Sequence, residues 1–364
     1  MGIFIHNPYL IITAYSLIWV LYFFLSLMVL VFIFILFFSF FKRRLENKKR
    51  LWQENVADII SHAIFFENDG VEKLEFKTED EHFLRNKTFR QYFINELICA
   101  KKNLSGAPIA NIINLYETLN LDKDSLEKIH NKKWHIKAKG VQELAVMEQV
   151  KYVKEIFRLT NDQHELVRNE AQCALVSFYG FKGLRFLNVI KYPISQWQQI
   201  QLLNYVHDLQ SADPQHLKKW LGPTNNSVVT FALYLASLYD CTGVYKEVIH
   251  CLQNPDRQVK LNALDYLKKI SSDDTADEII KCYASSDRVI QLNILSVLQE
   301  TGHEKQITFL LKQLHNTDHT IKLAAAKTLS SIHPSGSAFL QSHLFADEYP
   351  WAAIFSQIEN ERAA

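Results

Sequence analysis

Aspartate recurs at a constant interval in the C-terminal third of the chain, and this periodicity limits the fold more than any other feature. Asp256, Asp287 and Asp318 lie 31 residues apart, and an aliphatic residue follows each of them by three positions. Counting back from Val259 in steps of 30 or 31, the series continues through Val228, Trp197, Val167 and Ile136. A repeat of this length is typical of a solenoid, because one short unit cannot bury its apolar face without neighbours.

Each repeat has the pattern of two helices. Apolar or small residues follow the anchor at +4, +5 and +8, which is one face of an α-helix, and the preceding aspartate can cap its first N–H groups. A first helix is predicted before each of these, over 244–252, 275–283 and 304–314. The 10 glycines and 8 prolines in 364 residues agree with long helices. The fold predicted is all-α, with about seven helical hairpins.

Two segments carry a family resemblance. TNDQHELVRNEAQCAL (160–175) and NPDRQVKLNAL (254–264) resemble the Asp…Val-Arg…Ala…Ala-Leu pattern of HEAT repeats, in the short form found in phycobiliprotein lyases and many bacterial proteins. The resemblance extends over about residues 130–360 and implies an α-solenoid that presents a surface to a partner, but it specifies no activity. Trp197 in place of an aliphatic anchor and Val229 in place of a cation depart from the pattern.

The N-terminal region has a different composition. Residues 1–41 contain no Asp, Glu, Lys or Arg, and the apolar run over residues 10–41 exceeds the about 20 residues that a membrane-spanning helix needs. A single transmembrane helix is therefore predicted, with its lipid-embedded part at about residues 20–41. A cleaved signal peptide would instead carry its cations ahead of a shorter apolar stretch.

The cations after this run predict the orientation. Residues 42–50 contain six cations and one anion, Glu46; the six are Lys42, Arg43, Arg44, Lys48, Lys49 and Arg50. The positive-inside rule places them in the cytoplasm, against anionic lipid headgroups, with the N-terminus outside. We expect a single-pass protein of the bacterial inner membrane.

Five regions follow from these patterns. They are a tail and transmembrane helix (1–41), a basic juxtamembrane segment (42–50), an irregular helical region (51–133), HEAT-like repeats (134–346) and a C-terminal capping helix (347–364). Within the irregular region, helices are predicted over 51–66, 78–102, 108–119 and 125–134. Whether that region continues the repeats is left open.

The residues give little sign of catalysis. Deoxyhypusine hydroxylase has the same repeat class and holds two irons through His-Glu pairs, but the matching place here is Asn169-Glu170, and His164 lies in the preceding turn. His315 and His319 lack a third metal ligand, so we expect capping and solvated roles for this turn. No catalytic residue, cofactor or metal is predicted. Removing the +5 of residues 42–50 from the total of +1 leaves −4, which disfavours a nucleic-acid partner.

Helical phase suggests a partner-binding surface in the middle of the array. Offsets +3 and +6 from the anchor point away from the core, and there the two central units carry Ile200 and Leu203, then Phe231 and Tyr234. The alternative is a phase error of one residue in these units, which would make the four residues core. Trp134, among the cations of 128–139, is a further candidate contact, unless its ring packs inward.

The leading functional hypothesis is a membrane-anchored cytoplasmic scaffold that binds a protein partner, itself membrane-associated, through its solenoid. Two alternatives remain. One is an enzyme built on the repeats, hydroxylase-like or lyase-like, for which Glu170 and His164 would be the residues to test. The other is a signal-relay protein whose transmembrane helix pairs with other spans.

Overall fold

The protein is described here by a computed structural model that covers residues 8–65, 82–206, 214–222, 225–333, 336, 340 and 351–363. Every regular element in these ranges is a helix, so the all-α prediction is confirmed for them. The chain divides into two compact units, Met1–Asp124 and Ser125–Ala364. The division falls inside α5 (Leu121–Ile129).

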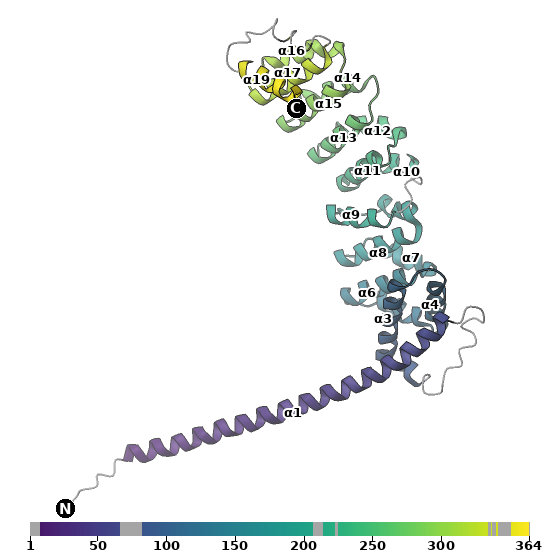
Figure 1. The fold of residues 1–364 in the computed structure, drawn as a ribbon, viewed down its shortest axis with the longest axis vertical. Helices are drawn as coiled ribbons and strands as arrows, with labels where there is room; N and C mark the ends of the chain where they lie inside the picture. Colours follow the sequence, from purple (N-terminus) through teal and green to yellow (C-terminus); the bar gives the residue numbers. More distant parts are fainter. Residues whose placement is uncertain are drawn as a thin grey trace, which may run out of the picture. The chain divides into compact units, whose positions relative to one another are not determined.

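The first unit is built on one long helix, α1, which runs from Pro8 to Phe65 (Figure 1). No glycine or proline occurs between residues 9 and 65, so nothing in the sequence interrupts the backbone hydrogen bonding. At 1.5 Å per residue, its 58 residues extend for about 87 Å. The predicted span, the basic segment 42–50 and the predicted helix 51–66 are thus parts of a single helix.

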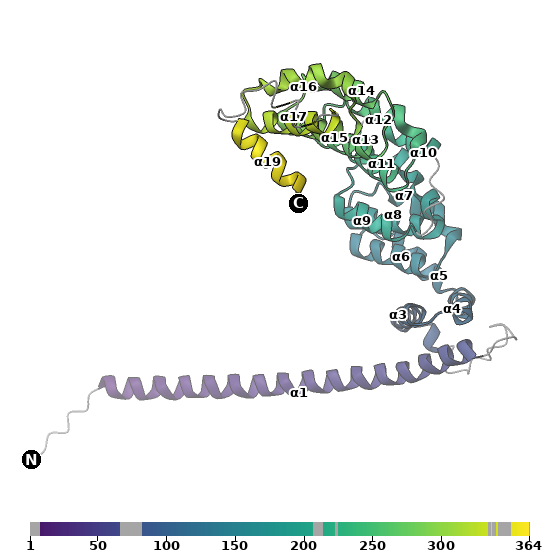
Figure 2. The ribbon, with the colours of Figure 1, turned by 45° about the horizontal axis from the view of Figure 1, so that its top comes forward.

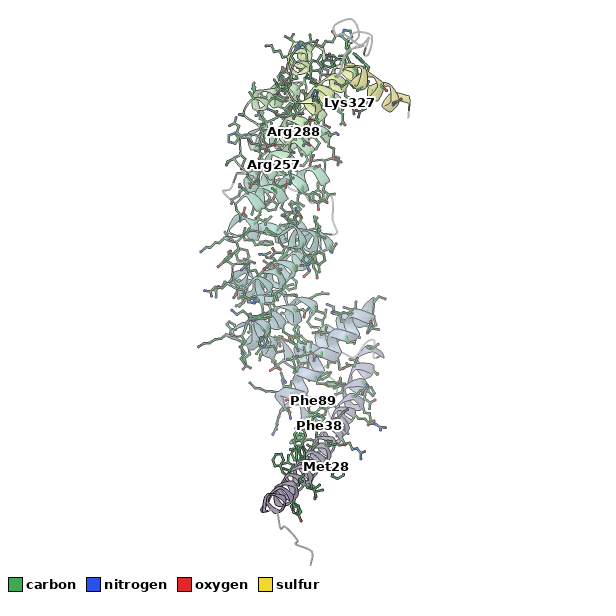
Figure 3. All side chains as sticks on the ribbon, turned by 90° about the vertical axis from the view of Figure 1, so that its left-hand side faces the viewer. Met28, Phe38, Phe89, Arg257, Arg288 and Lys327 are labelled. Carbon is green, nitrogen blue, oxygen red and sulfur yellow. The ribbon has the colours of Figure 1, made fainter. Side chains whose placement is uncertain are left out.

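The N-terminal part of α1 is apolar and uncovered. Residues 17–44 are long and apolar enough to cross a membrane, and none of this stretch is buried within the protein. Met28 and Phe38, labelled on this helix in Figure 3, are both exposed. Lipid would cover such a surface, although an export signal satisfies the same length and composition.

The C-terminal part of α1 enters the core of the first unit. Its buried stripe packs against α3 (Lys87–Asn103) and α4 (Ala107–Thr118) and consists of Trp52, Val56, Ile59 and Ala63. These residues are spaced 4, 3 and 4 apart, so they share one helical face. The ring of Trp52 meets Phe89 edge-on, with 5.5 Å between centroids. The apolar helix therefore continues into a packed core without a linker.

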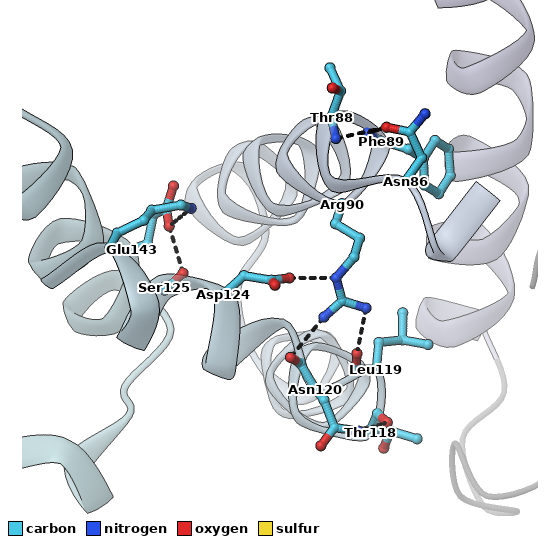
Figure 4. Close-up of polar contacts among 11 residues, drawn as sticks. Asn86, Thr88, Phe89, Arg90, Thr118, Leu119, Asn120, Asp124, Ser125 and Glu143 are labelled. Carbon is cyan, nitrogen blue, oxygen red and sulfur yellow. Dashed lines mark hydrogen bonds and ion pairs between the residues drawn. The ribbon is translucent and has the colours of Figure 1, made fainter. Parts of the chain in front are cut away.

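Arg90 holds three elements of this unit together (Figure 4). Its guanidinium donates to the carbonyls of Leu119 (3.2 Å) and Asn120 (2.8 Å), which end α4. Its Nε also donates to a carboxylate oxygen of Asp124 in α5, at 2.5 Å. A cation at these carbonyls suits the negative end of the α4 dipole. Asn120 has a φ of 53°, so the chain reverses sharply where Arg90 binds it.

The second unit consists of helix pairs stacked in two layers (Figures 1 and 2). The second helices of the pairs are α6 (Trp134–Val146), α8 (Glu165–Tyr179), α9 (Gln196–Asn204), α11 (Asn226–Leu238), α13 (Arg257–Lys269), α15 (Arg288–Thr301) and α17 (His319–Ile332). The first helices are α5, α7 (Val153–Leu159), the 3₁₀ helix η3 (Gly180–Asn188), α10 (Pro214–Leu221), α12 (Tyr245–Cys251), α14 (Thr275–Tyr283) and α16 (Ile307–Leu314). The described residues thus form seven pairs, followed by α19 (Trp351–Ala363).

The predicted core stripe is confirmed in the C-terminal repeats. In α13 the residues at 0, +4, +5 and +8 are Val259, Ala263, Leu264 and Leu267, and all four are buried. The corresponding residues of α11, α15 and α17 are buried as well. The three predicted first helices are also present, with the 3₁₀ turn η6 (Glu304–Gln306) opening the last.

The capping aspartates also join neighbouring repeats. Asp256, Asp287 and Asp318 each accept hydrogen bonds from backbone N–H groups at the start of their own helices, as predicted. Arg288, labelled with Arg257 in Figure 3, also pairs with Asp318 of the next repeat at 2.6 Å. Arg257 lies 3.4 Å from Asp287 in the same way. One carboxylate therefore caps the start of a helix and fixes the register of two repeats.

Two predicted elements differ at the ends of the array. The helix expected over 125–134 is α5, which begins at Leu121 and ends at Ile129. In the last helix the buried residues are Ile354, Phe355 and Ile358, whereas Ala352, which lies 31 residues after Ile321 and so continues the anchor series, is exposed. Residues 78–81 and 347–350 of two further predicted helices lie outside the described residues.

Replacing Arg90 by Ala should destabilise the first unit by about 2–3 kcal/mol, because two carbonyls and a carboxylate lose their donor together. Hydrogen exchange of the intact chain in detergent should show faster exchange in α3 and α4 and unchanged exchange in α13–α17. Arg85→Ala, at an exposed position of the same unit, is the matched control. Equal exchange in the two variants would contradict the role of Arg90.

Candidate partner-binding surface

The residue that caps each second helix determines which side chains face the core. In α11, α13, α15 and α17 the buried anchor lies three residues after the cap, as in Asn225 and Val228. In α9 the cap is Ser195, whose side chain accepts from the N–H of Gln198 while that Gln side chain accepts from the Ser195 N–H. Gln198 is therefore the anchor, and it is buried. Trp197, predicted as the anchor, is 66% exposed, so the predicted phase was wrong by one residue.

This phase places the two candidate residues of α9 differently. Ile200 is 52% exposed, whereas Leu203 is half-buried against the core of the second unit. Leu202 takes the fully buried position between them. Gln198 uses its side-chain amide to donate to Asn169 of α8, which holds the short helix α9 on its neighbour.

In α11 the two candidates also separate. Tyr234 is 49% exposed, but Phe231 is completely buried, so the prediction that Phe231 lies on a surface is wrong. Helix α11 is apolar around most of its circumference, which gives it a wider buried arc than an amphipathic helix has. Of the four predicted residues, Ile200 and Tyr234 are therefore exposed.

Trp134 joins two repeats and remains partly accessible. Its ring stacks on the ring of His164, with 4.1 Å between centroids and 5° between planes, and 43% of the residue is exposed. Of the cations around it, Lys137 pairs with Asp162 at 2.7 Å and Lys128 pairs with the buried carboxylate of Glu143. Part of the basic stretch therefore serves contacts within the unit. A partner contact at Trp134 stays a prediction.

Successive second helices stack in register, so equivalent positions form rows across the unit. Hydrogen bonds between repeats join residues about one repeat apart, such as Asn262 to the carbonyl of Thr230 and Thr328 to the carbonyl of Leu295. The position before the anchor, offset +3 and offset +6 each form one row. The rows through α6, α13 and α15 carry mostly polar side chains, including His135, Lys139, Asn262, Asp265 and Ser296.

Exposed apolar side chains gather on this face in the middle of the array. We call this group the aromatic patch; it consists of Leu166 on α8, Trp197, Ile200 and Tyr205 on α9, and Tyr234 and Leu238 on α11. Each member is more than 40% exposed. Leu166 and Trp197 occupy the same row, one repeat apart. Of the four residues predicted in the middle of the array, Ile200 and Tyr234 belong to the patch and Leu203 and Phe231 do not. That this surface binds a partner stays a prediction.

A cluster of titratable groups borders the patch. Burial raises the pKa of Glu170, which makes no ion pair or hydrogen bond with any residue that the structure describes. Burial, followed by the charge of Glu170, raises the pKa of the Cys173 thiol to about 12. The pKa of Tyr205 is raised by burial and then by the charges of Cys173 and Glu170, so the three groups lie close together.

The cluster offers binding chemistry more readily than catalysis. A thiol with so high a pKa is protonated at neutral pH and is a poor nucleophile. His164, the other residue of the enzyme hypothesis, stacks against Trp134 instead. Among the described residues, no group of three or more His, Cys, Asp or Glu side chains is placed to hold a metal ion. The expectation of no metal and no cofactor remains a prediction.

The basic residues after the apolar stretch lie on α1. Lys42, Arg43 and Arg44 are exposed, and Arg50 pairs with Glu54 at 3.2 Å. Lys48 and Lys49 are also on this helix, but their side chains are not among those that the structure describes.

Sequence reasoning missed Leu166, Trp197 and Tyr205 as surface residues. A signal for α9 was present, because Ser195 followed three residues later by Gln198 is the signature of a capping box. Starting the helix at Ser195 would have placed Gln198 in the core and Trp197 on the surface.

Replacing Glu170 by Gln should raise the melting temperature of the intact protein at about pH 8. Burial disfavours the charged carboxylate, so its raised pKa means that the folded state gains stability on protonation. The advantage of Glu170→Gln should therefore shrink as the pH falls through that pKa toward about 4. Glu300→Gln, which removes an exposed partner of Lys268, should show no such gain. A lower melting temperature for Glu170→Gln at pH 8 would contradict this account.

Comparison with known proteins identifies one part of the chain. Residues 245–330 match the family of HEAT repeats, and no curated protein sequence matches the chain. Three solved structures are similar at a low level. A designed armadillo repeat protein is 13% identical, with a TM-score of 0.29 over 58% of this chain and 99% of its own. Human deoxyhypusine hydroxylase in complex with glycerol is 12% identical, with a TM-score of 0.28 over 86% and 97%.

The complex of CpcE and CpcF of phycocyanin lyase from Nostoc sp. PCC7120 is 13% identical, with a TM-score of 0.23 over 79% of this chain and 98% of that one. Likeness at this level carries no information on function. What the comparisons show is a match to HEAT repeats over residues 245–330.

Proposed function

We propose that this protein is a membrane-anchored scaffold that binds a protein partner through its HEAT-repeat unit. The observation that carries the proposal is the joining, in one chain, of an exposed apolar helix to stacked HEAT repeats. Stacked helical repeats of this kind form extended surfaces that bind partners. Tethering such a unit to a membrane raises the effective concentration of its partner there, which suits a membrane-associated partner.

The arrangement proposed is a single pass through the bacterial inner membrane, with both the basic segment and the repeats in the cytoplasm. Lys42, Arg43 and Arg44 follow the apolar stretch directly, and no cation precedes it in the sequence. Cations at that level would contact anionic headgroups at about 1 kcal/mol each. The chain's five cysteines, free in the structure, agree with a reducing compartment.

The scaffold is proposed to act without catalysis. The thiol of Cys173 is held protonated, and burial likewise raises the pKa of Cys251 to about 11. The titratable groups described beside Glu170 are Cys173 and Tyr205, and their raised pKa values keep both protonated at neutral pH. Such a site can recognise a partner but is poorly equipped for bond making. A nucleic-acid partner is not proposed, because the chain after residue 50 carries a net charge of −4.

One observation favours signal relay as a second candidate. Helix α1 continues from the apolar stretch into the core formed by Trp52, Val56 and Ile59, with no loop between. A rotation or shift of the membrane part would therefore reach that core directly. A simple anchor does not require this continuity.

The proposed topology can be tested through Cys99, which is exposed on α3, whereas the other four cysteines are half-buried or buried. A membrane-impermeant maleimide should label the protein at least tenfold more after lysis of spheroplasts than before. Cys99→Ser should lose most of this label, and the protein should stay in the membrane fraction after an alkaline wash. Labelling of intact spheroplasts, or release by the wash, would contradict the proposed topology.

Anchor and relay differ in their response to changes in α1. Replacing residues 10–41 by an unrelated transmembrane helix should leave partner recovery from native membranes within twofold of wild type. Inserting two alanines after Glu46, which rotates the apolar stretch by about 200° relative to the core, should have equally little effect. If partner recovery is lost in both variants while the protein itself is present in the membrane at normal levels, signal relay is favoured over a plain scaffold.

A further inference from the structure

The aromatic patch lies between two carboxylates, Glu170 and Asp265, that form no ion pair with a described residue. Glu170 on α8 adjoins Tyr205 on one side of the patch, and Asp265 on α13 follows Tyr234 in the row of offset +6. Neither carboxylate makes a hydrogen bond or an ion pair with a described residue. Burial raises the pKa of both groups; Glu170 is half-buried, whereas Asp265 is exposed on its helix.

The cations near these carboxylates are bound elsewhere. Lys268 moderates the pKa of Asp265 through its charge, yet its ammonium pairs with Glu300 at 3.0 Å. Lys269 pairs with Asp240 at 2.6 Å. Lys139, one repeat before Glu170 in the same row, lies 3.9 Å from the buried carboxylate of Glu143. Glu170 and Asp265 are thus left as negative charges at the edges of an apolar surface.

Such a surface selects its occupant by charge. A partly desolvated carboxylate gains most from a cation brought into contact with it, because that contact restores the interactions lost with water. Exposed Trp and Tyr side chains contribute apolar area and can also receive a cation on their rings. Acidic segments, anionic lipid headgroups and nucleic acids would be repelled by both carboxylates.

We propose that the aromatic patch binds a segment of the partner protein in which apolar side chains are flanked by Lys or Arg. The cations lie against Glu170 and Asp265, and the apolar side chains cover Trp197, Ile200 and Tyr234. This inference rests on the proposed scaffold function and adds to it the place and the chemistry of binding.

The test places the photo-crosslinking residue benzoylphenylalanine at position 200 of the full-length protein in its native membranes. After irradiation, the attached peptide is sequenced by mass spectrometry. We expect another polypeptide, attached through a segment with Lys or Arg within about four residues of apolar side chains, which is one helical turn. The yield should fall at least tenfold with Glu170→Lys, Asp265→Lys or Tyr234→Glu.

Val289→Glu is the matched control. Val289 is an exposed apolar residue in the row before the anchor on α15, outside the patch. This variant should leave the yield within twofold of wild type. Attachment to lipid, to a second copy of this chain or to a segment without cations would overturn the inference, as would equal losses in Val289→Glu.

Defined peptides provide a second measurement that does not depend on the native partner. A 15-residue peptide of Leu and Lys, carrying a photo-crosslinking residue, should attach to α8–α13 of the intact protein more than tenfold better than its Leu and Glu counterpart. Glu170→Gln with Asp265→Asn should remove most of that preference. Equal attachment of both peptides at the patch would overturn the inference.

The two proposals fail in different ways. A partner that is recovered equally well by wild type and by Glu170→Lys or Tyr234→Glu would leave the scaffold function standing and remove the patch as its site. Melting temperatures close to wild type identify variants whose losses come from binding, and Glu170→Gln is expected to fold at least as stably as wild type.

Discussion

The second unit depends on burial between neighbours. A single pair of helices has apolar faces that it cannot cover by itself, and only the next pair along the chain completes the burial of residues such as Val259 and Leu267. The capping aspartates convert this general attraction into a fixed register. Asp318 caps the start of its own helix and receives Arg288 from the repeat before, so the stack cannot slide without breaking this ion pair.

A fixed register has consequences for the surface. Equivalent positions lie in rows, and neighbouring helices in a row are about 10 Å apart. A change from polar to apolar residues along one row therefore makes that part of the face apolar. Polar residues at both ends of the array and aromatic ones on α9 and α11 therefore produce a localised patch with acidic edges. The first unit has no such repetition. There, Arg90 and the stripe starting at Trp52 hold a small core to the continuation of the apolar helix.

Much of the repeat architecture could be predicted from the sequence. The interval between Asp256, Asp287 and Asp318 indicated the repeats, their caps and most of the buried stripe, because capping and helical spacing are local properties. The candidate surface was predicted less well. The interval of 31 favours Trp197 over Gln198 as the anchor, and a one-residue error turns a helix by about 100°. In an amphipathic helix, offset +3 from the anchor faces solvent, which predicts an exposed Phe231. Helix α11 is buried over a wider arc than such a helix, so Phe231 lies in the core.

The amino-acid sequence alone determined the helical repeats, the uncharged N-terminal stretch and the cations that follow it, since each depends on residues close together in the chain. Only the tertiary structure decided that α1 is one helix from Pro8 to Phe65, that Phe231 is core, and that Glu170, Cys173 and Tyr205 form one cluster. Those features depend on how far a neighbouring element covers a side chain. The burial of such a side chain depends on packing between repeats, and no pattern of neighbouring residues in the sequence specifies it.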